Sequence, residues 1–206
     1  MKKLGKKGFT LVEIIVVIAI IGILAAILIP TLINYTVKAN VTSANSTAAN
    51  LKKNLNAYLL EADMGNYGMK MIDTSHTEIE VSVTNGTWNV TVADPTQFVS
   101  IPGHVWTGTG TGVYGGGISN VSCPEDEMAI YLANLYPELE TAYMKFNVKA
   151  GDCNAMYYTD ETDTAFNLQT FAINGWSVNY YSWNNTTAGV CTEGYVVGTA
   201  PVLEIG

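Results

Sequence analysis

The sequence contains no arginine, and charged residues make up only 14% of its 206 positions. Lysine supplies all ten basic residues, against eighteen acidic ones, so the formal net charge is −8 at pH 7. Four of the ten lysines lie within the first seven residues, which leaves the rest of the chain strongly acidic. A broad nucleic-acid-binding face needs many cations to replace phosphate counterions. The composition therefore disfavours direct nucleic-acid binding and favours an extracytoplasmic location for the body of the protein.

Cysteine and histidine are also scarce. Cys123, Cys153 and Cys191 lie far apart, without a CxxC pair or the ligand spacing of a zinc site. His76 and His104 are the only histidines, and neither stands beside a cysteine or in a suggestive Ser/Asp arrangement. We therefore expect no catalytic residues, no metal centre built on these side chains and no cofactor.

The three cysteines allow three alternative disulfides in an oxidising compartment, each leaving one spare thiol. We favour Cys153–Cys191 among these pairings. The alternative is that all three are buried, unpaired residues that act as small hydrophobic side chains.

A long apolar run follows the amino-terminal lysines. The sixteen residues from Ile14 to Ile29 are all apolar or glycine, and Phe9 to Ile29 is a stretch of twenty-one residues. As a helix that stretch would be roughly 31 Å long, which matches the ~30 Å hydrocarbon core of a bilayer. The lysines should remain cytoplasmic, which places the chain after Pro30 outside. No small-residue cleavage site ends the run, so we expect the mature protein to keep it.

One carboxylate, Glu13, lies near the start of this run. An ionisable group in a membrane segment costs about 2–3 kcal/mol or more near the bilayer centre and is a functional candidate by default. The alternative is that Glu13 reaches the cytoplasmic interface and is merely tolerated there.

The residues around Glu13 resemble the leader of bacterial type IV prepilins and of the related pseudopilins. The segment KKGFTLVE, from Lys6 to Glu13, has the family's charge, glycine, aromatic residue and glutamate in the same order. The resemblance implies that a membrane-embedded peptidase cuts after Gly8 and methylates the new amino-terminal Phe9. It is close over about the first thirty residues, which also include the family's glycine, small residues and helix-loosening proline at Gly22, Ala25-Ala26 and Pro30.

The same resemblance implies a role for Glu13. Cleavage would give Phe9 a free α-amino group, which is strongly disfavoured if it remains unpaired in an apolar helix bundle. The carboxylate of a neighbouring subunit can neutralise it, and breaking such a buried pair typically costs about 3–5 kcal/mol. Whether the pair forms between subunits or within one is left open by the sequence.

Past Pro30 the apolar residues recur at alternating steps of four and three, which places them on one helical face. We predict one long helix from Phe9 to about Asp63, with its outer half packed against a sheet and loosened or kinked near Pro30. The alternative is a short exposed amphipathic helix after a membrane anchor. The periodic positions are Val37, Val41, Ala44, Ala48, Leu51, Leu55, Tyr58 and Ala62.

Two Asn-Gly turns predict β-hairpins in the remainder of the chain. The first joins strands over 78–83 and 88–92, and the second joins strands over 171–173 and 176–181. Residues 98–106 and 195–197 are candidates for further strands. Proline and three acidic residues at 124–127 predict the start of a helix that runs to about Tyr136, where Pro137 interrupts it.

Two weaker motifs favour ordinary surface segments. Residues 110–115 match G-x-G-x-x-G, but no helix opens within the motif, so we expect a flexible surface loop. Asp160 and Asp163 are weak candidates for a Ca²⁺ site, because they lack the spacing of a known loop, and solvated acids are the better interpretation.

These observations predict an α+β, pilin-like protein with a long amino-terminal helix packed on an antiparallel sheet. We expect a cleaved leader over 1–8, a helix over 9–63 whose part 9–29 spans the membrane or forms the filament core, and a head domain over 64–206. The resemblance implies a type IV pilus subunit without enzymatic activity, whose partners are other pilins, the prepilin peptidase/N-methyltransferase and an assembly platform. It is a membrane protein before assembly and an extracellular filament afterwards. The alternatives are a pseudopilin of a secretion or competence system and a membrane-tethered binding module.

Overall fold

The structure is a computed structural model that describes residues 8–64, 70–71, 76–99, 105–113, 123–160, 168–173, 176–181 and 196–201. The chain forms two compact units, Met1–Ala39 and Asn40–Gly206, and each is described by itself. The first helix, α1 (Leu11–Met64), contributes to both units. Its end at Met64 lies within one residue of the predicted end.

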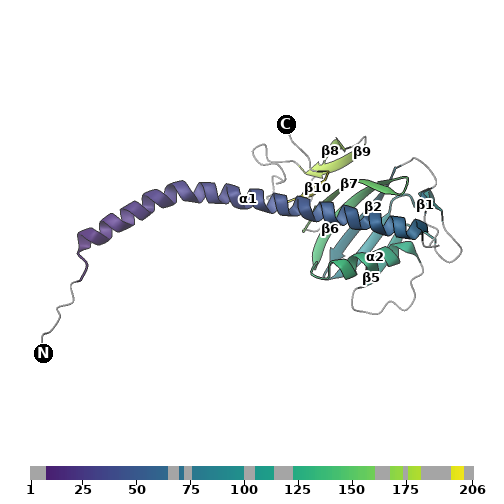
Figure 1. Ribbon diagram of the computed structural model, residues 1–206, viewed down its shortest axis with the longest axis horizontal. Coiled ribbons are helices and arrows are strands. Elements are labelled where there is room, and N and C mark those ends of the chain that lie inside the picture. Colours follow the sequence, from purple (N-terminus) through teal and green to yellow (C-terminus); the bar gives the residue numbers. More distant parts are fainter. Residues whose placement is uncertain are drawn as a thin grey trace, which may run out of the picture. The chain divides into compact units, whose positions relative to one another are not determined.

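The second unit is built on antiparallel strands and a second helix (Figure 1). This confirms the predicted α+β architecture. The strands are β1 (Lys70–Met71), β2 (His76–Thr84), β3 (Thr87–Val92), β4 (Phe98–Val99), β5 (Thr109–Val113), β6 (Thr141–Lys149), β7 (Asp152–Thr159), β8 (Leu168–Ile173), β9 (Trp176–Tyr181) and β10 (Gly198–Ala200). The helices are α1, the short 3-10 helix η1 (Pro95–Gln97) and α2 (Pro124–Leu135).

The main sheet has six strands in the order β10-β7-β6-β2-β3-β5, and all neighbouring pairs are antiparallel. The predicted hairpin β2–β3 forms around Asn85 and Gly86, whose positive φ angles of 51° and 72° suit a tight two-residue turn. The second predicted hairpin also forms, as the separate two-stranded sheet β8–β9. The sequence pattern therefore located both hairpins correctly.

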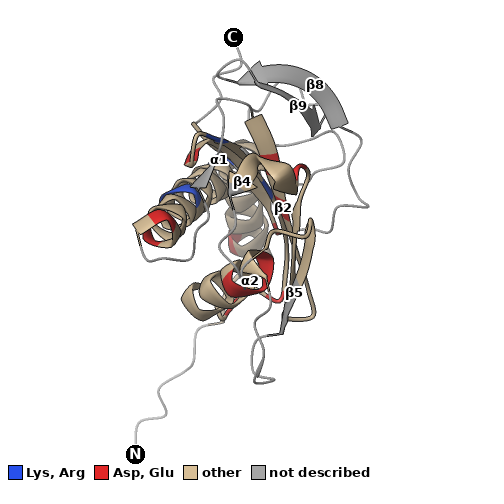
Figure 2. Cartoon of the chain, turned by 90° about the vertical axis from the view of Figure 1, so that its right-hand side faces the viewer, with Lys and Arg blue, Asp and Glu red and all other residues tan. Residues whose placement is uncertain are grey.

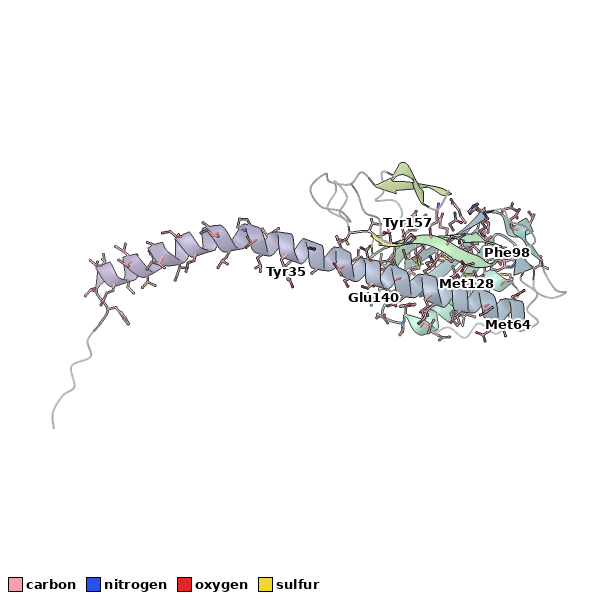
Figure 3. The ribbon with its side chains drawn as sticks, turned by 45° about the horizontal axis from the view of Figure 1, so that its top comes forward. Tyr35, Met64, Phe98, Met128, Glu140 and Tyr157 are labelled. Carbon is pink, nitrogen blue, oxygen red and sulfur yellow. The ribbon has the colours of Figure 1, made fainter. Side chains whose placement is uncertain are left out.

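Helix α2 and the Asn40–Met64 part of α1 cover the same face of the main sheet (Figures 1 and 2). Alternate residues of β2 are buried against them, and the intervening ones are partly exposed on the other face. The resulting core is formed by side chains from both helices and from the central strands (Figure 3). Its largest fully buried apolar members are Trp88, Phe146, Leu51, Leu55, Ile79, Met128, Leu132, Met144 and Met156.

Polar side chains of α1 attach the helix to the far edge of the sheet. Asn45 Oδ1 accepts a hydrogen bond from the Thr199 backbone N–H of β10 at 2.8 Å. Lys52 Nζ donates to the Asn154 carbonyl oxygen of β7 at 2.6 Å. These bonds satisfy strand backbone groups that would otherwise lie unpaired beneath the helix. The polar face of α1 therefore binds the sheet and is not simply a solvated surface.

Strand β10 approaches α1 so closely that only glycine fits at its first position. A Cβ atom on Gly198 would collide with the Ala44 carbonyl group and would lie 2.8 Å from the Asn45 backbone nitrogen. This strand was expected at 195–197, but it occupies Gly198–Ala200, with only an isolated bridge at Val196. The missing side chain of Gly198 is what permits the contact, and strand propensity alone does not signal such a residue.

Three further expectations require correction. Residues 109–113 were expected to be loop, but they form the edge strand β5. Its Gly110 is required because a Cβ there would collide with Glu125 of α2. The candidate strand over 98–106 is confirmed only at β4, and Trp106 lies outside any strand. Finally, β6 and β7 were not predicted at all, although they occupy the middle of the sheet.

Candidate functional site

The amino-terminal unit contains the residues singled out by the sequence. Gly8, Phe9 and Thr10 precede the helix and are exposed, with Phe9 86% exposed. The helix was expected to start at Phe9, but it begins at Leu11. The two residues at the expected cleavage position therefore lie outside the helix, in a segment whose backbone is not engaged in helical hydrogen bonds.

The side chains of Thr10 and Glu13 explain why the helix begins there. The Thr10 backbone N–H and hydroxyl both donate to Glu13 Oε2, at 2.8 and 2.7 Å. In return the Glu13 backbone N–H donates to the Thr10 hydroxyl oxygen at 3.3 Å. This reciprocal pattern is a capping box, with Thr10 as N-cap and Glu13 three residues later. The sequence T-L-V-E carries this signal, and sequence reasoning missed it because attention was on the charge of Glu13.

The capping box changes the interpretation of the buried-charge problem. Within one chain the Glu13 carboxylate already accepts two hydrogen bonds through a single oxygen, Oε2. Among the described residues Oε1 accepts no hydrogen bond. The carboxylate is thus oriented by its own helix and keeps one oxygen for an additional donor.

The apolar half of α1 is not covered by the rest of its own unit. Its large side chains between Phe9 and Ile29 are each more than half exposed, and they project from the helix (Figure 3). This is the one helix in the described part of the chain that is long and apolar enough to cross a membrane. Burying a large apolar side chain contributes about 1.5–3 kcal/mol, so leaving this whole set in water would cost tens of kcal/mol. The segment needs lipid or other apolar helices around it.

Gly22 and Pro30 lie within this helix. A Cβ atom on Gly22 would contact nothing, so no close approach within the chain explains the glycine. The helix continues through Pro30, and the hydroxyl of Thr31 donates to the carbonyl oxygens of Leu28 at 2.8 Å and Ile27 at 3.4 Å. This side chain helps to satisfy carbonyl groups in the turn before the proline, where one amide donor is missing. The loosening expected near Pro30 stays a prediction.

The remaining candidate residues lie apart from this unit. Cys123 and Cys153 are buried free thiols, and burial raises the pKa of each to about 12. Cys191 lies outside the described residues, so the Cys153–Cys191 disulfide stays a prediction. Asp160 is exposed and Asp163 is not described, and the described residues contain no group of three side chains that could hold a metal ion.

The histidines form no catalytic pair among the residues that the structure describes. His76 lies at the start of β2, where its Nδ1 is 2.8 Å from Asn147 Oδ1. His104 is outside the described residues. The buried carboxylate of Glu125, which sequence reasoning placed only in the first turn of a helix, accepts hydrogen bonds from the backbone N–H groups of Thr107 and Gly108 at 2.9 and 2.7 Å. It connects α2 to the strand it covers and serves the fold.

Comparisons with known proteins agree with the importance of the amino-terminal unit. Residues 3–29 match the family model described as the prokaryotic N-terminal methylation motif. A fimbrial protein of Pseudomonas aeruginosa is 49% identical over 57 residues, which are 28% of this chain and 37% of that protein. Fimbrial protein Q of Moraxella bovis is 40% identical over 83 residues, which are 40% of this chain and 52% of that protein.

A third relative, the type IV major pilin protein PilE1 of Neisseria gonorrhoeae, is 46% identical over 55 residues, covering 27% of this chain and 33% of that protein. The matched part of the chain thus spans between about a third and a half of these curated relatives. No solved structure matches the chain.

Proposed function

We infer that this chain is a pilin, because its leader motif, its relatives and its α+β fold together support a type IV pilin. Its proposed function is structural. The subunit is held in the cytoplasmic membrane by the apolar half of α1, with its amino terminus on the cytoplasmic side. It is then assembled into an extracellular filament that supports adhesion, surface motility or DNA uptake.

The proposed first step is removal of residues 1–8 by a prepilin peptidase, followed by methylation of Phe9. The exposed, non-helical position of Gly8 and Phe9 supports this step, since a protease binds extended backbone more readily than helix. The new amino terminus would lie immediately before the capping box. Cleavage at Gly8–Phe9 therefore leaves both partners of the capping box, Thr10 and Glu13, in the mature chain.

The proposed second step joins subunits. The free oxygen of Glu13 would receive the α-amino group of Phe9 from a neighbouring subunit. In a surrounding of apolar helices an unpaired ammonium group is strongly disfavoured, so this pairing favours one axial position of the incoming subunit. The exposed apolar side chains of α1 would exchange lipid contacts for contacts with other helices, and Gly22 would allow close helix approach.

The observation that carries the proposal is the combination of a capped carboxylate with an otherwise uncovered apolar helix. The chain itself provides no basic group for Glu13 among the described residues and no cover for the apolar side chains. Both requirements are met at once by identical neighbours in a helical array.

The proposal can be tested with Glu13→Ala and Glu13→Gln in cells that export the full chain. Mass spectrometry of the mature protein should show a chain that begins at methylated Phe9 in the wild type and in both variants. Electron microscopy with antibody against the head should show labelled fibres for the wild type and few or none for either variant. Glu140→Gln, which removes an exposed head carboxylate, is the matched control and should leave fibres unchanged.

A wild-type chain that retains residues 1–8 would refute the assignment as a processed pilin. Normal fibres from Glu13→Gln would refute the role of the carboxylate charge while leaving the processing step intact. Label confined to the cell envelope in the wild type would instead favour a pseudopilin of a secretion or competence system, which is similar in the same leader segment.

A further inference from the structure

A cavity in the head lies between the two helices that cover the sheet. It has a volume of about 350 Å³ and is lined from α1 by Tyr58 and Glu61, and from α2 by Glu127 and Tyr131. Acidic residues are present on both helices where the end of α1 faces the viewer (Figure 2). All of these residues belong to the second unit, so the cavity does not depend on the membrane segment or on filament assembly.

The aromatic wall of the cavity is fixed in place. The rings of Tyr58 and Tyr131 have centroids 5.4 Å apart and are tilted by 45°. The Tyr58 hydroxyl donates to the Pro124 carbonyl oxygen at 3.1 Å, and only 7% of this residue is exposed. One ring is therefore anchored by its hydroxyl and supports the other, half-buried ring. Rings held in this way provide a preorganised negative π surface.

The charges of the cavity have the same sign as that surface. Glu61 and Glu127 contribute carboxylates from opposite helices, and the lining includes no lysine. Lys52 of α1 cannot supply the charge, because its Nζ is bonded to the Asn154 carbonyl oxygen at the sheet. Among the described residues Glu61 has no ion-pair partner. A cation between these groups would lower their mutual repulsion and would also lie near the aromatic rings.

We propose that this cavity binds a small organic cation with an alkylammonium group, whose charged head contacts the tyrosine rings and the two carboxylates. The cavity lies within the size range of small-ligand sites, and its apolar walls suit the carbon atoms of such a ligand better than a hydrated metal ion. This inference goes beyond the structural role proposed above and gives the head a ligand of its own.

The test uses the full chain in a non-ionic detergent and choline as the probe. Saturation-transfer NMR should show saturable choline binding with a dissociation constant on the order of 1 mM, as suits a ligand of this size. The matched probe is 3,3-dimethyl-1-butanol, in which carbon replaces the charged nitrogen at nearly unchanged shape. It should bind at least about fivefold more weakly, because the cation–π and carboxylate attractions require the charge.

Variants locate the binding. Tyr131→Leu should weaken choline binding about fivefold, since it removes a ring face while keeping an apolar side chain. Glu61→Gln should weaken it about threefold, whereas Glu138→Gln, an exposed acid outside the cavity, should have no effect. Circular dichroism would show that each variant is folded, and the comparison of the two probes on the wild type requires no variant.

The proposal is overturned if choline shows no saturable binding, or if the neutral probe binds as tightly as choline. Equal choline affinity of the wild type and a folded Tyr131→Leu would likewise overturn it. A loss of affinity in Glu138→Gln as large as that in Glu61→Gln would show attraction to the acidic surface as a whole and would also exclude the cavity as the site.

Discussion

Replacement of Glu125 by alanine should destabilise the head strongly. Its carboxylate is completely buried in the first turn of α2, and Oε1 accepts hydrogen bonds from the backbone N–H groups of Thr107 and Gly108. Alanine has no acceptor, so both N–H groups would lose their partner beneath the helix. The segment that leads into β5 would then be held to α2 by apolar contacts alone.

The magnitude follows from the two lost bonds. Leaving a buried donor without an acceptor costs about 1–3 kcal/mol, so two donors correspond to about 2–6 kcal/mol of unfolding free energy. This is a large part of the ~5–15 kcal/mol typical of a folded domain. Glu125→Gln should cost much less, because an amide oxygen can still accept from both N–H groups, although neutral acceptors form weaker bonds.

Urea unfolding of the full chain in a non-ionic detergent measures this difference. Tryptophan fluorescence is a suitable signal, because Trp88 and Trp106 are both buried in the core and Trp106 stacks on Phe98 with a ring separation of 4.4 Å. With a urea dependence of about 1–3 kcal/mol per molar, the midpoint for Glu125→Ala should fall by one molar or more. Glu138→Ala, an exposed acid, should leave the midpoint nearly unchanged.

The reasoning would be refuted if Glu125→Ala unfolded at the wild-type midpoint. Equal losses in the alanine and glutamine variants would also contradict it, because they would attribute the effect to the charge and not to the two accepted hydrogen bonds.

Three further predictions concern the head. Gly198→Ala should lower the unfolding free energy by about 2–4 kcal/mol, because its methyl group collides with the backbone of α1; an unchanged urea midpoint would contradict this close contact. The thiols of Cys123 and Cys153, with pKa values of about 12, should react with iodoacetamide about a thousandfold more slowly than free thiols until urea unfolds the head, as measured by peptide mapping; rapid labelling of the native chain would show that they are not buried. Hydrogen bonds from Thr96 and then Gln97 lower the pKa of Asp94 from its ordinary value of 3.8, so its stabilising effect is present above that value and is lost as the pH falls through the lower folded value. Asp94→Asn should therefore reduce the acid dependence of the urea midpoint, and a variant with the same dependence would argue against this carboxyl group as a contributor.

Local sequence patterns predicted much of the fold. The long helix was found from its apolar run and from the 3-4 spacing that follows it, and its end was placed within one residue. Both Asn-Gly hairpins and the helix after Pro124 were also located correctly. Each of these features depends on residues close together in the chain, where periodicity, turn residues and capping residues act directly.

The central strands were missed because their pattern is not local. In β6 the side chains of Tyr143 and Asn147 are buried on the face opposite to that of Met144 and Phe146. A strand that is buried on both faces loses the apolar–polar alternation by which a half-buried strand is recognised. Strand β5 was missed for another reason, since its glycines resemble a loop until the crossing of α2 explains them.

The candidate sites divide in the same way. The sequence by itself determined the amino-terminal unit, namely the leader residues, the apolar segment and Glu13, because all of its chemistry lies within about thirty consecutive residues. Only the tertiary structure decided that Glu125 is buried, that Asn45 and Lys52 bind the sheet, and that Tyr58 and Tyr131 share one cavity. These residues are brought together by the packing of two helices on one face of the sheet, and contacts between residues some seventy to a hundred and fifty positions apart leave no periodic signal in the sequence.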